Sequence, residues 1–187
     1  VALFVGDDAA LQEGALAAAL QLLATIGVHP VLIGNGRNSG YVPASLGLRT
    51  LARDLAQQTH AELAASGAHT LLVLTPGDAY TFRQLHPDRL ALPLPEQVEV
   101  VEVVTVLANA LVEGRLALRQ REGDSAVAYL DPSHAPRSQR DPAAARLLLE
   151  AATGAPLREL FWSGERGQTS GATSLQYTQA ALAERLA

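Results

Sequence analysis

The chain has 187 residues, of which 48% are hydrophobic, and a formal net charge of -5 at pH 7. It contains no cysteine, which excludes disulfides, thiol nucleophiles and metal centres held by thiolates. Its 14 basic residues are all arginines scattered singly, which disfavours a nucleic-acid partner, and no apolar stretch reaches the roughly 18 residues that span a bilayer, so we expect a cytoplasmic protein that is not membrane-embedded.

The first half of the chain predicts three buried strands separated by two helices. Short apolar runs that end in turn residues predict strands at Val1–Val5, Pro30–Ile33 and Thr70–Leu74. Leucines and alanines at helical spacing predict helices at Ala9–Ile26 and Ser45–Ser66. Continuous rather than alternating apolar strands indicate a parallel sheet with helices on both faces, so we expect a Rossmann-like α/β fold.

The second half of the chain is predicted to restart the same plan. The expected elements are a helix at Val98–Val112, short strands at Arg115–Leu118 and Ala126–Leu130, a helix that begins at Asp141-Pro142 and runs to about Ala152, a strand at Leu157–Phe161, and a helix from Thr173 onward. The chain ends inside the last of these helices, so the final strand of this half is expected to be missing.

Two polar-polar-glycine triplets mark the internal repeat. Asn38-Ser39-Gly40 follows the second strand of the first half, and Thr169-Ser170-Gly171 takes the corresponding place in the second. The extended segment Leu92-Pro93-Leu94-Pro95 is the expected seam. We therefore predict two Rossmann-like halves with mainly parallel sheets flanked by helices, at residues 1–95 and 96–187, either as two lobes or as one sheet.

These motifs resemble the cysteine-rich CCG domain of heterodisulfide reductase subunits and of the iron-sulfur subunits of glycolate and lactate oxidases. In that family each half carries Gly-Cys after a strand, then a Cys-Cys-Gly loop and a Cys-Pro-x-Cys turn. The corresponding segments here read Gly6-Asp7, Asn38-Ser39-Gly40 and Thr75-Pro76-Gly77-Asp78. The family's Asp-Pro-Cys-His in the second half is matched by Asp131-Pro132-Ser133-His134. The resemblance covers nearly the whole chain.

The resemblance implies that the scaffold is kept and the cluster ligands are lost. The positions that resemble ligands are now occupied by oxygen-bearing residues: Asp7, Asn38, Ser39, Thr75, Asp78, Ser133, Thr169 and Ser170. We expect no catalytic residue, metal or iron-sulfur cluster on this chain, since such side chains are poor substitutes for thiolates. The expected role is structural or partner-binding, with a flavin-containing oxidase subunit that carries FAD as the implied partner.

The chain opens on Val1 inside an apolar run, without a methionine or a leader, so we expect a piece of a longer protein. A ferredoxin-like electron-transfer segment of the kind found in the resembled complexes could precede it.

The polar strand ends also admit other chemistry. Their side chains can satisfy one another in Asx and Ser/Thr turns, which is the interpretation that we favour. Asp7, Asp78 and Asp131 could instead converge with His134 on a hard metal ion, as in a metal-assisted hydrolase. The neighbours Ser133 and His134 lack the spacing of a nucleophile and its base.

Two glycine-containing loops could cradle an anion. Gly34-Asn35-Gly36-Arg37 and Gly164-Glu165-Arg166-Gly167 could each surround a phosphate, although neither fits a P-loop. A small-molecule or anion-binding module is therefore the alternative function. Phe161-Trp162 is expected in the core or the seam, and the remaining histidines carry no ligand spacing: His29, His60, His69 and His86.

Overall fold

In a computed structural model the protein is an α/β fold built on one four-stranded, all-parallel sheet with strand order β2-β1-β3-β4. The description covers residues 1–120, 126–132, 143–166 and 181. The strands are β1 (Ala2–Gly6), β2 (Val31–Arg37), β3 (Thr70–Val73) and β4 (Glu99–Glu102). The predicted α/β class and the parallel Rossmann-like arrangement are confirmed.

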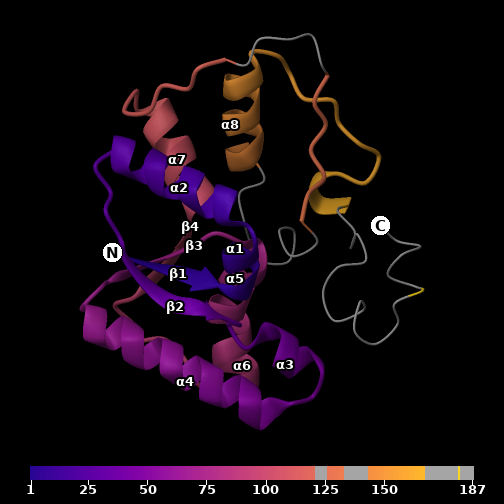
Figure 1. Cartoon of the computed structure of the whole chain (residues 1–187). Helices are drawn as coiled ribbons and strands as arrows, with labels where there is room; N and C mark the ends of the chain where they lie inside the picture. The colour runs from indigo at the N-terminus through magenta and orange to yellow at the C-terminus, as the bar shows by residue number, and fades with distance from the viewer. Residues whose placement is uncertain (121–125, 133–142, 167–180, 182–187) are drawn as a thin grey trace.

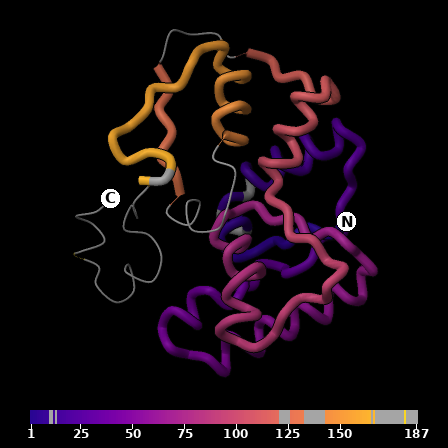
Figure 2. The backbone as a smooth tube through the Cα atoms, turned by 180° about the vertical axis from the view of Figure 1, so that it is seen from behind, coloured from indigo at the N-terminus to yellow at the C-terminus, as the bar shows by residue number. Residues whose placement is uncertain are grey.

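Helices cover both faces of the sheet, as Figures 1 and 2 show from opposite sides. One face carries α2 (Glu13–Thr25) and α7 (Val103–Val112), with α8 (Ala143–Thr153) packed on α7. The other face carries α4 (Arg49–Ser66) and the π-helical turn η1 (Thr81–Leu85). The remaining short elements are α1 (Asp7–Leu11), α3 (Tyr41–Ser45), α5 (Pro76–Tyr80), α6 (His86–Leu90) and the 3-10 turn η2 (Gly164–Arg166).

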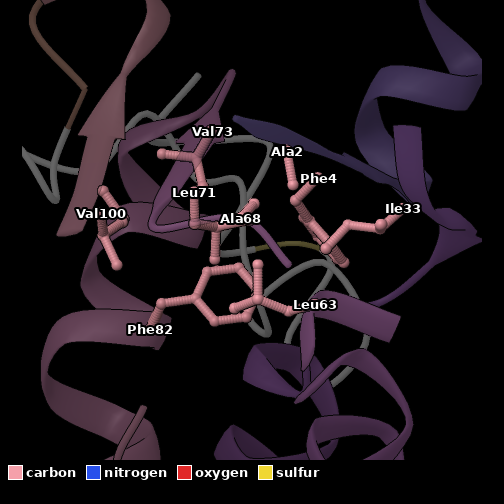
Figure 3. Packing of buried hydrophobic residues seen from close by; sticks show 10 residues of the cluster. Ala2, Phe4, Ile33, Leu63, Ala68, Leu71, Val73, Phe82 and Val100 are labelled. Atoms are coloured by element: carbon pink, nitrogen blue, oxygen red, sulfur yellow. The ribbon is translucent and has the colours of Figure 1, made fainter. Parts of the chain in front are cut away.

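Alternate strand residues fill two separate apolar layers. Leu3 and Leu72 face α2 and α7, whereas Phe4 and Leu71 face α4 and η1. In Figure 3 the rings of Phe4 and Phe82 lie within the layer that faces α4 and η1, and they meet edge to face with centroids 5.0 Å apart. Each fully buried side chain of this size contributes about 1.5–3 kcal/mol, so these two layers hold the sheet between its helices.

The edge strand β2 bends where three successive residues adopt positive φ. Gly34, Asn35 and Gly36 have φ of 95°, 47° and 76°. A Cβ atom at Gly34 would lie 2.7 Å from the ring of Phe4, so glycine is required there for packing as well as for conformation. The pairing of β1 with β2 changes register at this bulge, and Asn38 follows directly after the end of β2.

The helix predicted at Val98–Val112 is wrong in its first part. Glu99–Glu102 forms β4, paired with β3, and the helix α7 begins only at Val103. The strand reads Glu-Val-Val-Glu, and its two β-branched valines suit a strand at the edge of the sheet, where Glu99 is exposed and Val100 is buried. The strand therefore extends the sheet built by β1, β2 and β3.

Both predicted helices of the first half form, but with different bounds. Ala9–Ile26 is divided between α1 and α2 at Gln12, whose φ and ψ of -120° and 59° are not helical. The helix predicted from Ser45 begins at Arg49, after the separate turn α3. These breaks leave the order of elements as predicted.

The remaining predicted strands of the second half are largely absent from the described residues. Arg115–Leu118 is not a strand, and the segments at Ala126–Leu130 and Leu157–Phe161 meet in a single parallel bridge between Ala128 and Arg158. The predicted helix up to Ala152 is confirmed as α8 from Ala143 onward. The helix predicted from Thr173 lies outside the described residues, and the division at residue 95 stays a prediction.

Candidate functional site

The candidate site is the edge of the sheet where the parallel strands end. β1 is followed by Asp7, β2 by Asn38 and Ser39, and β3 by the turn that carries Thr75 and Asp78. In an open parallel sheet the carboxyl ends of the strands lie together, which is where such folds usually bind ligands. The structure therefore gathers the five predicted positions of the first half at one edge.

Asn38 links the end of β1 to the turn after β2. Its Nδ2 donates to Oδ2 of Asp7 at 2.8 Å, while its Oδ1 accepts from the backbone N–H of Gly40 at 2.9 Å and of Val42 at 3.3 Å. Gly40 has a φ of 100°, and a Cβ there would lie 3.1 Å from the carbonyl oxygen of Ala52. The amide of Asn38 thus holds a turn that packs against α4.

Asp78 is held by two hydroxyl groups. Thr75 caps α5 by accepting from the Asp78 backbone N–H at 3.2 Å, and its hydroxyl donates to Oδ2 of Asp78 at 2.9 Å. The side chain of Ser39 also hydrogen-bonds to this carboxyl group. Burial raises the pKa of Asp78 to about 6, against the lowering effect of Ser39 and Thr75. This carboxyl group therefore titrates close to neutrality.

We call the five residues Asp7, Asn38, Ser39, Thr75 and Asp78 the strand-end network. Side-chain hydrogen bonds join Asp7 to Asn38 and join Ser39 and Thr75 to Asp78, while Asn38 and Ser39 are neighbours in the chain. The donors and acceptors are hydroxyl, amide and carboxyl groups that already bond one another. This set does not fit an iron-sulfur cluster, which needs thiolate ligands.

Asp8 adds a third carboxyl group next to those of Asp7 and Asp78 in the network. Burial, followed by repulsion from Asp7, raises the pKa of Asp8. Among the residues that the structure describes, no group of three or more His, Cys, Asp or Glu side chains is arranged to hold a metal ion. Of the two further ligands predicted from the sequence, Asp131 binds an arginine, and His134 lies outside the described residues.

Asp131 is instead locked by Arg146 of α8. The guanidinium donates through Nη1 to Oδ1 at 2.8 Å and through Nη2 to Oδ2 at 2.7 Å, and the backbone N–H of Gly164 donates to Oδ2 at 2.7 Å. Arg146 also bonds Glu159 and lies over the ring of Tyr129. We call this set the Asp131 clamp. The other predicted positions of the second half lie outside the described residues: Ser133, Thr169 and Ser170.

Both glycine-containing loops already hold a carboxylate of the chain itself. Glu62 of α4 accepts from the Gly34 backbone N–H at 2.8 Å and pairs with the guanidinium of Arg37. The hydrogen bond from Gly34, followed by that from Arg37, lowers the pKa of Glu62. At the second loop, Gly164 donates to Asp131. Gly34, Arg37 and Gly164 therefore each bond a carboxylate of the chain itself.

Sequence reasoning missed a pair of histidines next to the network, one of which is buried. Nδ1 of His86 lies 3.0 Å from Nε2 of His60, and Nε2 of His86 lies 2.8 Å from the carbonyl oxygen of Ser39. His86 is fully buried. Burial lowers the pKa of His86 to about 4 and also lowers the pKa of His60. The two residues are 26 positions apart, so no local motif could have indicated the pair.

The expectation that Phe161 and Trp162 are core or seam residues is wrong. Their rings meet edge to face 4.8 Å apart, but the two residues are 74% and 50% exposed. They follow the segment that forms only a single bridge, so no sheet is present there to cover them in the described residues. The pair is a surface feature.

The resemblance to the CCG domain rests on sequence motifs alone. No family model, curated protein or solved structure matches this chain. In the part of the chain that the structure describes, no helix has the length and apolar character needed to cross a membrane. The function therefore has to be argued from the strand-end network and its surroundings.

Proposed function

We propose that this chain is a cluster-less CCG-type domain, similar to the iron-sulfur subunit of a flavin-linked 2-hydroxyacid oxidase, with a structural or partner-binding role. The observation that carries the proposal is the convergence of Asp7, Asn38, Ser39, Thr75 and Asp78. These are the positions that resemble cluster ligands, and they form two hydrogen-bonded groups at the edge of the sheet, which meet where Asn38 precedes Ser39 in the chain.

The chemistry of the network supports a loss of electron transfer rather than a new reaction. Carboxylates, hydroxyls and an amide do not hold iron-sulfur clusters, and none of them is a redox group at ordinary potentials. The side chains of Asn38 and Thr75 each hydrogen-bond neighbouring groups. In a parent oxidase the electrons would have to travel through FAD and clusters on other segments.

Exposed apolar side chains support a partner-binding role. Leu46, Leu48 and Leu51, around the start of α4, are between 37% and 52% exposed, and Phe161 and Trp162 add an aromatic pair. Large exposed apolar and aromatic side chains are typical of binding surfaces. A flavin-containing oxidase subunit is the partner that the resemblance implies.

Anion binding by this edge is disfavoured by its charge. Asp7, Asp8 and Asp78 surround the strand ends, and repulsion from both Asp7 and Asp8 contributes to the raised pKa of Asp78. A phosphate placed there would meet carboxylates rather than cationic donors. The loop with Gly34 and Arg37, which is better suited to an anion, already holds Glu62.

Restoring cysteines at the network tests the proposal. The variant changes all five positions and is treated anaerobically with iron and sulfide beside the unmodified chain: Asp7→Cys, Asn38→Cys, Ser39→Cys, Thr75→Cys and Asp78→Cys. Because the strand ends already bring these positions together, we expect cluster absorbance and stoichiometric iron and sulfide after desalting of the variant. The unmodified chain should retain neither.

A matched control distinguishes cluster binding at a preformed site from nonspecific iron binding by added thiols. It carries five cysteines at exposed, scattered positions: Gln21, Thr50, Gln58, Ala65 and Glu96. It should retain no stoichiometric iron. A network variant that keeps its circular dichroism spectrum but binds no more iron than this control would contradict the ancestry proposed for the site.

The partner-binding role is tested separately, by affinity purification of the full-length protein from its own cells. We expect a flavoprotein to co-purify, recognised by flavin absorbance in the eluate. Replacing Leu48 and Leu51 by serine should reduce its yield if the exposed leucines contribute to the contact. Co-purification that is unchanged in this variant would exclude that surface, and the absence of any flavoprotein would contradict the implied partner.

A further inference from the structure

Three polar contacts tie α4 to the segment formed by η1 and α6. Arg49 and Arg53 donate to the backbone carbonyls of Arg89, at 2.7 Å, and of Leu90. One turn further along α4, Ala56 belongs to the same buried cluster as Leu85 and Leu90. After another turn, His60 contacts His86. We call this contact the α4–α6 seam. Its arginine contacts keep their charge at all ordinary pH values, whereas the histidine contact can titrate.

The hydrogen bonds fix the proton positions in the histidine pair. The Ser39 carbonyl can only accept, so Nε2 of His86 must carry a hydrogen and donate to it. In neutral His86 the other nitrogen, Nδ1, is then an acceptor. The hydrogen bond between the rings must therefore run from Nε2–H of His60 to Nδ1 of His86.

A proton added to His86 cannot be accommodated without a change at His60. Charged His86 carries a hydrogen on Nδ1, which would face the Nε2–H of His60 across 3.0 Å. His60 can accept that hydrogen only by moving its own to Nδ1, and it cannot accept at all once it is charged too. Two charged rings at this distance repel each other as well as lacking an acceptor.

We propose that the His60–His86 pair is an acid-released latch on the turn at Asn38–Gly40. In the closed state His86 holds the Ser39 carbonyl while His60 holds His86, so the seam and the turn are joined through one buried ring. Once each ring has taken up a proton, neither can accept the other's hydrogen and the two charges repel, which separates the rings, loosens η1 and α6 from α4, and frees the turn. Because Asn38 and Ser39 belong to the strand-end network, the latch sets how firmly that network is closed.

Two titratable groups lie close to His86: His60, which it contacts, and Asp78, whose pKa burial raises to about 6. From α4 it meets His60, from the turn after β2 it meets the Ser39 carbonyl, and from η1 it meets the ring of Phe82 edge to face at 4.9 Å. Asp78 of α5 lies behind Ser39, bonded to its side chain. Exposed Asp88 and Arg89 follow on α6 itself, beyond His86.

The direction of the effect follows from burial. Burial, opposed by the Ser39 hydrogen bond, lowers the pKa of His86 from 6.5 to about 4 in the closed state, and an opened ring returns toward its ordinary pKa. A group whose folded pKa is depressed stabilises the closed state above the ordinary pKa, and this contribution is lost as pH falls toward the folded pKa. The latch therefore operates between pH 6.5 and pH 4, and acid opens it.

Amide hydrogen exchange at the turn tests the latch in the full chain. The reporters are the backbone N–H groups of Gly40 and Val42, which bond to Asn38, with Leu72 of β3 as a reporter of global unfolding. After correction for intrinsic exchange rates, protection of Gly40 should fall roughly 30-fold from pH 6.5 to pH 4.5. Leu72 should remain better protected than Gly40 throughout, because the opening is local.

The deciding variant is His60→Gln, since a glutamine amide offers both a donor and an acceptor and can bond His86 in either protonation state. In this variant the fall in Gly40 protection should shrink to below roughly fivefold. His29→Gln makes the same change at an exposed histidine and should keep the full fall. A fall that is equal in His60→Gln and the unmodified chain, or no fall at all, overturns the latch.

A second measurement needs no variant. Long-range nitrogen–proton spectra of the imidazole rings at pH 7 should show His86 protonated on Nε2 alone and His60 protonated on the Nε2 that faces it. A hydrogen on Nδ1 of His86 at this pH, or two charged rings that stay in contact at pH 4.5, would contradict the proposed mechanism.

Discussion

Asp78, in the first turn of α5, and Asp131, which follows the bridged segment around Ala128, are surrounded by different donors. Asp78 receives hydroxyl groups from Thr75 and Ser39, and burial raises its pKa to about 6. Asp131 receives both arms of the Arg146 guanidinium and the Gly164 backbone N–H. A guanidinium compensates the charge of a buried carboxylate, whereas hydroxyl groups only solvate it, and burial accordingly raises the pKa of Asp78 despite its two hydroxyl donors.

Breaking the clamp should have the largest effect on stability. Arg146→Met leaves Asp131, only 3% exposed, without its cationic partner, and we expect the free energy of unfolding to fall by about 3–5 kcal/mol. Urea denaturation followed by circular dichroism measures it. Arg158→Met is the matched control on an exposed arginine and should change stability by less than about 0.5 kcal/mol. Equal effects of the two substitutions would show that the clamp adds nothing.

The charge of Asp78 should appear in the pH dependence of stability. Because its folded pKa lies above the ordinary 3.8, its contribution is fully present below pH 3.8 and is lost as pH rises through 6. Asp78→Asn should therefore gain about 2 kcal/mol relative to the unmodified chain between pH 4 and pH 7. Urea denaturation at both pH values tests this. Asp54→Asn, at an exposed site on α4, is the control, and a pH-independent difference for Asp78→Asn would contradict its burial.

Removing one hydroxyl from the network should have a smaller effect. Thr75→Val deletes both the cap on the Asp78 backbone N–H and the donor to its carboxylate, and we expect a loss of about 1–2 kcal/mol. The pKa of Asp78 should rise further because a lowering hydrogen bond is gone. Thermal unfolding and carboxyl carbon NMR measure the two effects. Thr25→Val, whose exposed hydroxyl bonds only a carbonyl of its own helix, should leave both nearly unchanged.

The smallest effect is expected at a surface ion pair. Arg115 donates to Glu113 at 2.7 Å, but about half of each side chain is exposed. Arg115→Ala should therefore change the free energy of unfolding by less than about 0.5 kcal/mol. A loss of stability comparable to that of Arg146→Met would mean that hydrogen-bond geometry, rather than burial of the carboxylate, decides how much an ion pair stabilises the fold.

The first half could be predicted because its signals are local. Uninterrupted apolar runs gave β1 and β3 within a residue or two, and parallel strands must bring Asp7, Asn38 and Thr75 to one edge. The polar turns that follow each strand also indicated that these side chains would satisfy one another. The break at Gln12 and the bulge at Gly34 were not predictable, since each depends on how a helix or strand fits its neighbour.

The errors have a common physical cause, which is tertiary contact between distant segments. Glu99–Glu102 forms a strand because β3 offers an edge to pair with, and its valines favour that pairing. The pairs His60–His86 and Asp131–Arg146 join residues that share no motif. The predicted strands near Ala128 and Arg158 failed because a single bridge, without neighbouring strands, does not build a sheet.

The most direct test of the account is the iron and sulfide content of the unmodified full chain after anaerobic reconstitution and desalting. Oxygen and amide side chains at the strand ends predict substoichiometric iron, no acid-labile sulfide and an absorbance spectrum without cluster bands. Stoichiometric iron and sulfide that stay with the chain through desalting would contradict the claim that the strand-end network has replaced a cluster.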